Sequence, residues 1–319
     1  MVRATIATLV LGLFLTGAGV APVVTADPVA GGSTACQMPP NSVGGQGLGD
    51  AEAVLASDTA WNTHVAYVES ALAETPTTEA LFQLPDGLWT PDRVRQQNEL
   101  IDQYWQVYRG ESVPREGRAI IAGGVSGVGK TTVLQGQPAI ENQRYFTINP
   151  DDVKELMAAR SMIPAIAGLS PMEASANAHE EASMLAKRLA DRAYWLRTNV
   201  VWDITMSSEA SVRERIAAMR EAGYSQIDGV FVDAPLQTAR VRVMQRWRRG
   251  QEKYWAGEGL GGRYVPADFI DMSKPDKPGF SSRNEEIFDR VREQFSSTVE
   301  YDTSGAEPVL RCVTGPRWN

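Results

Sequence analysis

The chain is poor in the residues that hold transition metals in proteins. Its 319 residues include only two cysteines, Cys36 and Cys312, and two histidines, His64 and His179. This content excludes a zinc site built from several of these ligands. The helical segment at His179 also has Ser183 where a zinc protease would need its second histidine, which excludes metalloprotease chemistry. Two interpretations of the cysteines stay open: a bridge between the N-terminal linker and the C-terminus of an exported protein, or buried or free thiols.

An excess of positive charge is also absent. The chain has 31 lysines and arginines against 39 aspartates and glutamates, a formal net charge of -8. General nucleic-acid binding needs a basic surface that neutralises phosphates, so no nucleic-acid partner is expected. Apolar residues make up 43% of the chain and charged residues 22%, which is typical of a soluble globular protein with a sizeable core.

Long hydrophobic runs are missing except at the N-terminus. There, Arg3 precedes an uncharged apolar run from Ile6 to Val20, and small residues follow at Val24–Ala26. The run spans about 15 residues, whereas a membrane span usually needs about 20. We therefore expect residues 1–26 to be a secretory signal peptide and the protein to be exported or associated with the cell envelope. The alternatives are an uncleaved anchor, or a start codon placed too far upstream of a cytoplasmic enzyme.

The next two segments differ in composition. Residues 27–50 are rich in glycine, proline and serine and are expected to be a flexible linker. Residues 51–110 are expected to form a helical extension, because apolar residues recur at helical spacing over 51–75. Thr90-Pro91-Asp92 then provides a good helix start, and that helix is predicted to run to about Tyr108.

Short apolar runs alternate with helical segments after residue 118. The runs are typical of buried parallel strands and fall at 119–122, 145–148, 200–203 and 230–233. The helical segments between and after them fall at 131–136, 151–159, 171–196 and 211–222. This alternation predicts an α/β fold in which helices cover both faces of a parallel sheet.

A complete phosphate-binding loop follows the first of these strands. Residues 124–131 read GVSGVGKT and match the pattern G-x-x-x-x-G-K-[ST]. Its glycines let backbone N–H groups approach phosphates, its lysine adds positive charge, and Thr131 has a hydroxyl suited to Mg²⁺. We expect ATP or GTP to contact Gly124, Val125, Ser126, Gly127, Val128, Gly129, Lys130, Thr131 and Thr132. The fold class is therefore a P-loop NTPase-type parallel sheet sandwiched by helices; the alternative is a glycine-rich turn with an incidental Lys-Thr pair.

Acidic residues follow two of the other predicted strands. Asp151 and Asp152 come after the second strand, and Asp203 ends the third, followed by Thr205. Carboxylates at this end of a parallel sheet face the crevice where ligands bind. We expect Asp151 to accept the proton of an attacking hydroxyl and Asp203 to hold Mg²⁺ through water. The alternatives are helix capping for the first pair and local backbone contacts for Asp203.

A cluster of arginines lies near a glycine-rich stretch. Five arginines fall within ten residues, at Arg240, Arg242, Arg246, Arg248 and Arg249, and the stretch 257–262 precedes Arg263. Arginines on a mobile flap neutralise charge that develops on a transferring phosphoryl group. Arg246 and Arg263 are the candidates for this role, whereas a solvated helix face is the alternative for the others.

Several of these runs, in this order, resemble the zeta toxin family of P-loop kinases over residues 90–300. The similarity rests on the loop 124–131 and on Ile148-Asn-Pro-Asp151-Asp-Val-Lys154, His179-Glu-Glu-Ala-Ser183, Asn199-Val-Val-Trp-Asp203-Ile-Thr205 and Gly261-Gly-Arg263-Tyr-Val-Pro266. The resemblance implies a kinase domain at 111–319 that uses ATP or GTP with Mg²⁺. It also implies phosphorylation of a sugar hydroxyl on UDP-N-acetylglucosamine or a related nucleotide sugar, and a possible antitoxin or immunity-type partner.

The resemblance also implies roles for individual residues. It places the catalytic base at Asp151 and the phosphate-stabilising cations at Lys130, Arg246 and Arg263, with substrate contacts at Asp152, Glu181 and Thr205. Two features depart from the family pattern: an aspartate at 203 where glutamate is frequent, and a signal peptide on a protein whose implied substrates are cytosolic. A kinase of another small molecule and a nucleotide-binding effector without phosphoryl transfer remain alternatives. We also expect residues 51–85 to pack on the kinase as a built-in cover.

Overall fold

The computed structural model describes residues 57–318, all of which belong to one compact unit, Ala35–Asn319. The predicted signal peptide and linker and Cys36 lie outside these residues, whereas Cys312 is disulfide-bonded. No helix within 57–318 is long and apolar enough to cross a membrane.

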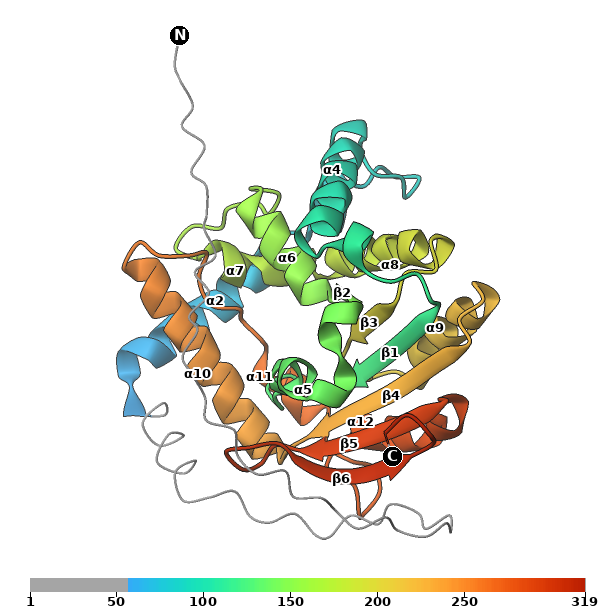
Figure 1. Ribbon diagram of the computed structural model, residues 1–319. Helices are drawn as coiled ribbons and strands as arrows, with labels where there is room; N and C mark the ends of the chain where they lie inside the picture. The colour runs from blue at the N-terminus through green and yellow to red at the C-terminus, as the bar shows by residue number, and fades with distance from the viewer. Residues whose placement is uncertain (1–56, 319) are drawn as a thin grey trace. The chain divides into compact units, whose positions relative to one another are not determined.

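Six strands form one sheet in the order β2-β3-β1-β4-β5-β6. Strands β1 to β5 are parallel, and β6 pairs antiparallel with β5 at the edge. The strands are β1 (Arg118–Gly123), β2 (Phe146–Ile148), β3 (Val200–Asp203), β4 (Gln226–Asp233), β5 (Ser297–Asp302) and β6 (Val309–Thr314). The first four coincide with the predicted apolar runs, and the expected α/β fold is confirmed (Figure 1).

Helices surround the sheet. They are α2 (Thr59–Glu74), α3 (Thr78–Phe82), α4 (Pro91–Val107), α5 (Lys130–Gly136), α6 (Pro150–Ala159), α7 (Pro171–Ala174), α8 (His179–Trp195), α9 (Glu209–Glu221), α10 (Leu236–Trp255), α11 (Ala267–Asp271) and α12 (Arg283–Val291). Short 3₁₀ turns lie at Gly110–Ser112, Pro138–Ile140, Asn142–Arg144, Ser175–Ala178 and Arg292–Gln294. The single helix predicted over 171–196 is therefore interrupted between α7 and α8.

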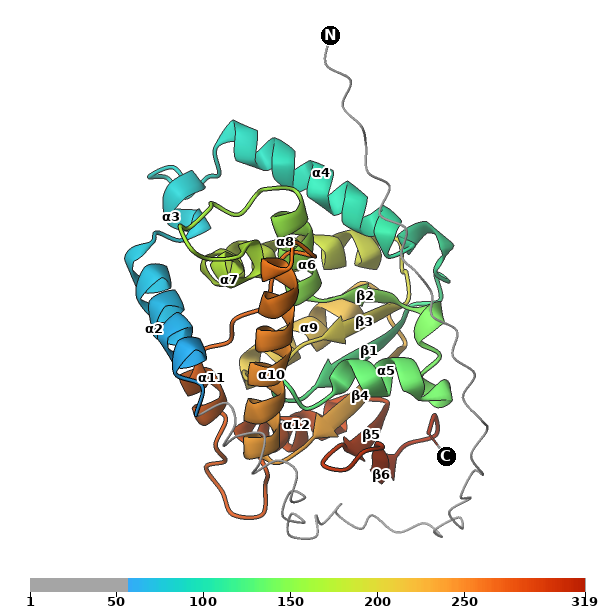
Figure 2. The same cartoon turned by 90° about the vertical axis from the view of Figure 1, so that its left-hand side faces the viewer.

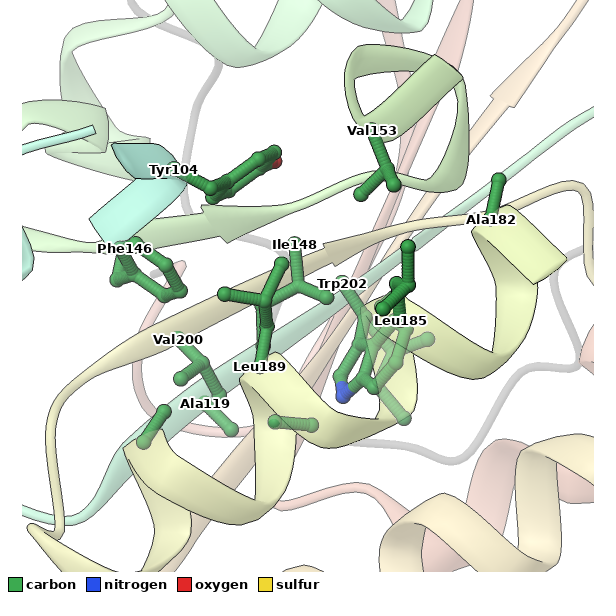
Figure 3. Packing of buried hydrophobic residues seen from close by; sticks show 14 of the residues in the cluster. Tyr104, Ala119, Phe146, Ile148, Val153, Ala182, Leu185, Leu189, Val200 and Trp202 are labelled. Atoms are coloured by element: carbon green, nitrogen blue, oxygen red, sulfur yellow. The ribbon is translucent and has the colours of Figure 1, made fainter. Parts of the chain in front are cut away.

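Alternating side chains of the central strand separate two cores. Ala119 and Ile121 of β1 join a cluster with α4, α6, α8, α9 and α12, whereas Ile120 and Ala122 join a cluster with α5, α10 and α11. Figure 3 shows Leu185 of α8 packed beside Trp202 of β3 in the first cluster. A strand buried on both faces needs apolar side chains at every position, which explains its continuous apolar run.

The helical extension divides into two parts. Helix α4 packs on the first core through Leu100, Ile101, Tyr104 and Trp105. Helix α2 packs elsewhere, in a third cluster that includes Trp247 of α10 (Figure 2). Asp58 caps α2, since its side chain accepts a hydrogen bond from the Trp61 amide at 3.0 Å.

Candidate active site

The phosphate-binding loop connects β1 to α5 at the carboxyl edge of the sheet. Gly124, Gly127 and Gly129 have positive φ angles of 137°, 90° and 92°. A Cβ on Gly124 would lie 2.2 Å from the Val232 carbonyl oxygen, and one on Gly127 would lie 2.4 Å from that of Ala239. Both positions therefore require glycine, because the loop passes so close to neighbouring backbone.

The loop forms one wall of a cavity of about 830 Å³. Ser126, Gly127, Gly129, Lys130, Thr131 and Thr132 line it. Gly124 lies behind them, its amide bonded to the Thr205 carbonyl oxygen at 3.3 Å. The side chains of Val125 and Val128 are buried in the core cluster that contains Ile120 and Ala122, and this packing holds the loop on the sheet. The opposite walls include Asn149, Pro150, Asp151, Lys154, Ala176, His179, Ser183, Asp203, Thr205, Ser207, Ser208, Ser211, Arg215, Arg242, Arg246, Arg249, Arg263 and Tyr264.

Lys130 lies between the loop and a buried carboxylate. Its Nζ donates to the Gly124 carbonyl oxygen at 2.9 Å and lies 3.8 Å from Oδ1 of Asp203. The other oxygen of Asp203 accepts from Nδ2 of Asn149 at 3.1 Å. Burial raises the pKa of the Asp203 carboxyl, and the charge of Lys130 opposes that rise.

Thr131 and Asp203 both line the cavity, and both offer oxygen ligands suited to Mg²⁺. Within residues 57–318 no group of three or more His, Cys, Asp or Glu side chains could hold a metal ion. This fits the usual mode of Mg²⁺ binding, in which one or two protein ligands combine with waters and substrate phosphates. The residues present therefore fit a magnesium ion that arrives with a nucleotide.

Asp151 lies in the first turn of α6, where its amide donates to the side chain of Asn149 at 2.9 Å. Its carboxylate forms ion pairs with Arg263 at 2.7 Å and Lys154 at 3.4 Å. Burial raises the pKa of the Asp151 carboxyl, but the cations Arg263, Lys154 and Lys130 outweigh burial and hold it below its usual value. Asp151 is therefore an anion at neutral pH.

The arginine cluster divides between the cavity and the surface. Arg242, Arg246 and Arg249 line the cavity. Arg240 instead pairs with Asp271 at 2.5 Å, and Arg248 pairs with Asp58 at 2.7 Å. Burial lowers the pKa of Arg246, and the nearby Arg263 charge lowers it further. Two such cations held close together make the cavity favourable for phosphate oxygens.

Two residues predicted to contact substrate are not brought to the cavity. Glu181 is fully buried between α8 and α4, where Arg93 donates to it from Nε at 2.8 Å and from Nη2 at 2.7 Å. Gln97 adds a third hydrogen bond at 2.8 Å. These bonds occupy the carboxylate of Glu181 and hold α4 on α8, which is a structural position rather than one facing substrate.

Asp152 is the second of these residues. Its side chain does not line the cavity, in contrast to that of the adjacent Asp151. Burial and the nearby Glu155 charge together raise the pKa of Asp152 to about 7, although a hydrogen bond with Tyr108 opposes the rise. Thr205, by contrast, does line the cavity, and its carbonyl oxygen accepts from Nδ2 of Asn284 at 2.6 Å.

His179 and Ser183 line the cavity in place of Glu181, although the sequence interpretation gave them no such role. They lie four residues apart and therefore on one face of α8, whereas Glu181 projects from another face. The helical phase of the run HEEAS was the signal that distinguishes them. Arg215 of α9 was also missed, since nothing near it in the sequence marks it as part of a site.

The chain is similar to one protein family and to several solved structures. The family model described as "Zeta toxin" matches residues 107–296, and no curated protein matches the chain. A solved structure of AvrRxo1-ORF1:-ORF2 with ATP is 19% identical, with a TM-score of 0.56, over 76% of this chain and 77% of that one. The same complex with sulphate ions gives 19% identity and 0.55, over 76% and 78%. A structure from the PezAT toxin-antitoxin system of Streptococcus pneumoniae gives 12% and 0.48, over 71% and 82%.

The solved structures share the fold at low identity, whereas the family model covers more than half of the chain, including the phosphate-binding loop, Asp151, Asp203 and both candidate arginines. The protein belongs to the zeta toxin family, which has the P-loop NTPase fold.

Proposed function

We propose that the protein is a kinase that transfers the γ-phosphoryl group of ATP or GTP to a hydroxyl group of a small acceptor. The observation that carries this proposal is that Lys130, Asp151, Arg246 and Arg263 line one cavity. Enzymatic phosphoryl transfer depends on positioning and on neutralising charge, and this cavity has a base and several cations for those tasks. A solved relative in fold that contains ATP supports the choice of nucleotide.

The phosphate-binding loop would hold the triphosphate. Lys130 already lies against the loop and would bind the outer phosphate oxygens. Thr131 and Asp203 would hold Mg²⁺, which neutralises phosphate charge when bound. Arg246 and Arg263 would stabilise the charge that develops on the transferring group, since both are held in the cavity.

Asp151 would orient the acceptor hydroxyl and accept its proton. It is anionic at neutral pH because of its cationic neighbours. Its ion pair with Arg263 links the base to a phosphate-binding cation across the cavity. A phosphoryl group bound near Arg263 would therefore lie close to the carboxylate that receives the proton.

The acceptor is proposed to be UDP-N-acetylglucosamine or a related nucleotide sugar. Support comes from the family and from cations of the cavity wall, such as Arg215 and Lys154, which suit an anionic acceptor. A second candidate is a kinase for a different small molecule. The observation that favours it is the position of Glu181, which is buried against Arg93 rather than facing the acceptor.

Mass spectrometry of a nucleotide-sugar mixture incubated with enzyme, ATP and Mg²⁺ tests the activity and names the acceptor. Phosphorylation adds about 80 Da to one species, as expected for transfer of a phosphoryl group. A gain on a UDP-sugar supports the first candidate, and a gain on another metabolite in a cell extract supports the second. The Lys130→Ala variant should lose the product, which ties the reaction to the loop.

Asp151→Asn separates catalysis from binding. The amide cannot accept the proton, so transfer should fall by about 10²- to 10⁴-fold while ATP affinity is retained. Titration with a fluorescent ATP analogue measures that affinity. A wild-type protein that binds ATP but transfers phosphate to no acceptor would instead be a nucleotide-binding effector.

Two further proposals concern the setting of the enzyme. An antitoxin or immunity-type protein is proposed as a partner, because the relatives in fold were solved as AvrRxo1-ORF1:-ORF2 complexes. Export or association with the cell envelope is proposed from the N-terminal sequence, with a cytoplasmic location as the alternative if that segment is misread. Fractionation of cells that express the full chain, followed by N-terminal sequencing, distinguishes these locations.

A further inference from the structure

Helix α2 contacts the segment that carries Arg263. We use flap for residues 257–266, which join α10 to α11. Trp61 of α2 packs against Trp247 of α10, with ring centroids 4.7 Å apart. Tyr264 of the flap also packs against Trp247, with ring centroids 4.9 Å apart, and its hydroxyl donates to Glu69 of α2 at 3.2 Å. Figure 2 shows α2 and α10 next to each other.

A buried carboxylate lies beneath these rings. Glu173 of α7 is completely buried, and one of its oxygens accepts from Nε1 of Trp247 at 2.9 Å. The other accepts from the amide and hydroxyl of Ser170 at 2.9 and 3.0 Å. Within residues 57–318, the only ion pair of Glu173 is with Nε2 of His64 on α2, at 2.6 Å. Helix α2 therefore supplies a side-chain hydrogen-bond partner to this buried acid.

The same residues seat the flap. The amide of Met172 donates to the Leu260 carbonyl oxygen at 3.0 Å. A Cβ on Gly261 would lie 2.1 Å from Oγ of Ser170, and one on Gly262 would lie 1.9 Å from the Trp247 carbonyl oxygen. The flap backbone therefore packs closely against Ser170 and against Trp247 of α10, and Glu173 forms hydrogen bonds with both of these residues.

Arg263 comes directly after these two glycines and reaches across the cavity to Asp151 at 2.7 Å. We propose that α2 is a positioning element for Arg263, and that His64 is a positioning residue that acts through Glu173 and the flap. This inference rests on the proposed kinase function. It replaces the expected role of residues 51–85 as a cover, because none of the described residues among them lines the large cavity.

The central test compares His64→Ala with the wild type. Loss of the hydrogen bond between His64 and Glu173 should let the flap shift. Misplacement of a catalytic group by about 1 Å costs up to about 10²-fold in rate. We expect kcat to fall at least tenfold, with a change in the KM for ATP of less than threefold. His64→Gln keeps a donor for Glu173 and should restore most of the rate. Ala66→Gly is the matched control, because it weakens α2 at an exposed position outside this network.

A double variant shows whether His64 acts through Arg263. If it does, His64→Ala should lower kcat in the wild type but not in an Arg263→Ala background. Equal losses in both backgrounds would overturn the proposal. If His64→Ala fails to fold, Tyr264→Phe tests the same coupling, since it removes only the bond to Glu69.

Hydrogen–deuterium exchange keeps the inference separate from the proposed reaction. Peptides that cover the flap should exchange faster in His64→Ala than in the wild type or Ala66→Gly, whether or not an acceptor is known. Unchanged flap exchange in His64→Ala would refute the positioning role. If the wild type transfers no phosphate but the flap still exchanges faster in His64→Ala, only the kinase assignment is refuted.

Discussion

Two buried acids, Asp233 at the carboxyl end of β4 and Glu285 of α12, predict an unusual dependence of stability on pH. Glu285 and Asp233 both lie within hydrogen-bond distance of one hydroxyl, Oγ of Ser281, at 2.8 and 2.5 Å. A hydroxyl has one proton, so it cannot donate to both carboxylates at once. A proton on one of the acids supplies the missing donor. Burial and the nearby Asp233 charge together raise the pKa of Glu285 from 4.5 to about 7, although hydrogen bonds from Ser281 oppose the rise.

The sign of the effect follows from this shift. An acid whose pKa is higher in the folded state binds more protons when folded, so it stabilises the fold at low pH. That contribution is complete below the unfolded pKa near 4.5 and is lost as pH rises through about 7. The rise of this pKa from 4.5 to about 7 corresponds to about 3 kcal/mol.

Urea unfolding of the wild type and Glu285→Gln at pH 5, 6, 7 and 8 measures this contribution. The amide stays neutral at every pH, so the free energy of unfolding of the variant should fall less between pH 5 and 8, by up to about 3 kcal/mol. Glu293→Gln, at an exposed position, is the control and should follow the wild type. Parallel curves for wild type and Glu285→Gln would refute the argument that Glu285 is protonated in the fold.

Two more substitutions test the buried ion pair and the loop. Arg93→Ala should lower the free energy of unfolding by about 3–5 kcal/mol, because it leaves Glu181 buried without a cation, whereas Arg95→Ala, in an exposed pair with Asp92, should cost less than about 1 kcal/mol. Chemical denaturation measures both, and equal small effects would contradict the structural role of Glu181. Gly124→Ala should abolish measurable ATP binding by calorimetry, because its Cβ would lie 2.2 Å from a carbonyl oxygen, whereas Gly136→Ala meets no atom within 4 Å and should bind normally.

Strands β1 to β4 and the loop could be predicted because each depends on local sequence. The run at 119–122 is buried on both faces, and the loop motif directly follows it. Strand β5 was missed because Thr298, Glu300 and Asp302 make its sequence look exposed. Glu300 is nevertheless buried, since Arg292 pairs with it at 2.5 Å. That partner is a tertiary contact, which the pattern within the strand does not show.

The residues of the candidate site also differ in whether local sequence could predict their position. Lys130, Asp151 and Arg263 follow strands or glycine-rich turns, and the structure places all three at the cavity. Glu181 lies on a helix, where a shift of two residues changes the face. Its partner Arg93 is 88 residues away in the sequence, so no local pattern indicates that its carboxylate is already occupied.

These distant partners bear on where the kinase domain begins. The sequence predicts a domain at 111–319, but Glu173 of α7 and Glu181 of α8 pair with His64 and Arg93, which precede it. A fragment that starts at residue 111 leaves Glu181 buried without its cation, at about 4 kcal/mol, and removes the His64 hydrogen bond of Glu173, at about 2 kcal/mol, or about 6 kcal/mol together.

The same fragment also loses four large apolar side chains of the first core: Leu100, Ile101, Tyr104 and Trp105. At about 2 kcal/mol each, these contribute about 8 kcal/mol. The combined loss of about 14 kcal/mol reaches the upper end of the total stability of a typical domain, about 5–15 kcal/mol. We therefore expect residues 111–319 to show no cooperative unfolding by near-ultraviolet circular dichroism, whereas 57–319 should unfold cooperatively. A fragment from residue 86 restores Arg93 and the four side chains but not His64, so its stability should fall between the two. A cooperative transition for 111–319 that matches the longer chain would show that α2 and α4 are accessories rather than parts of the kinase core.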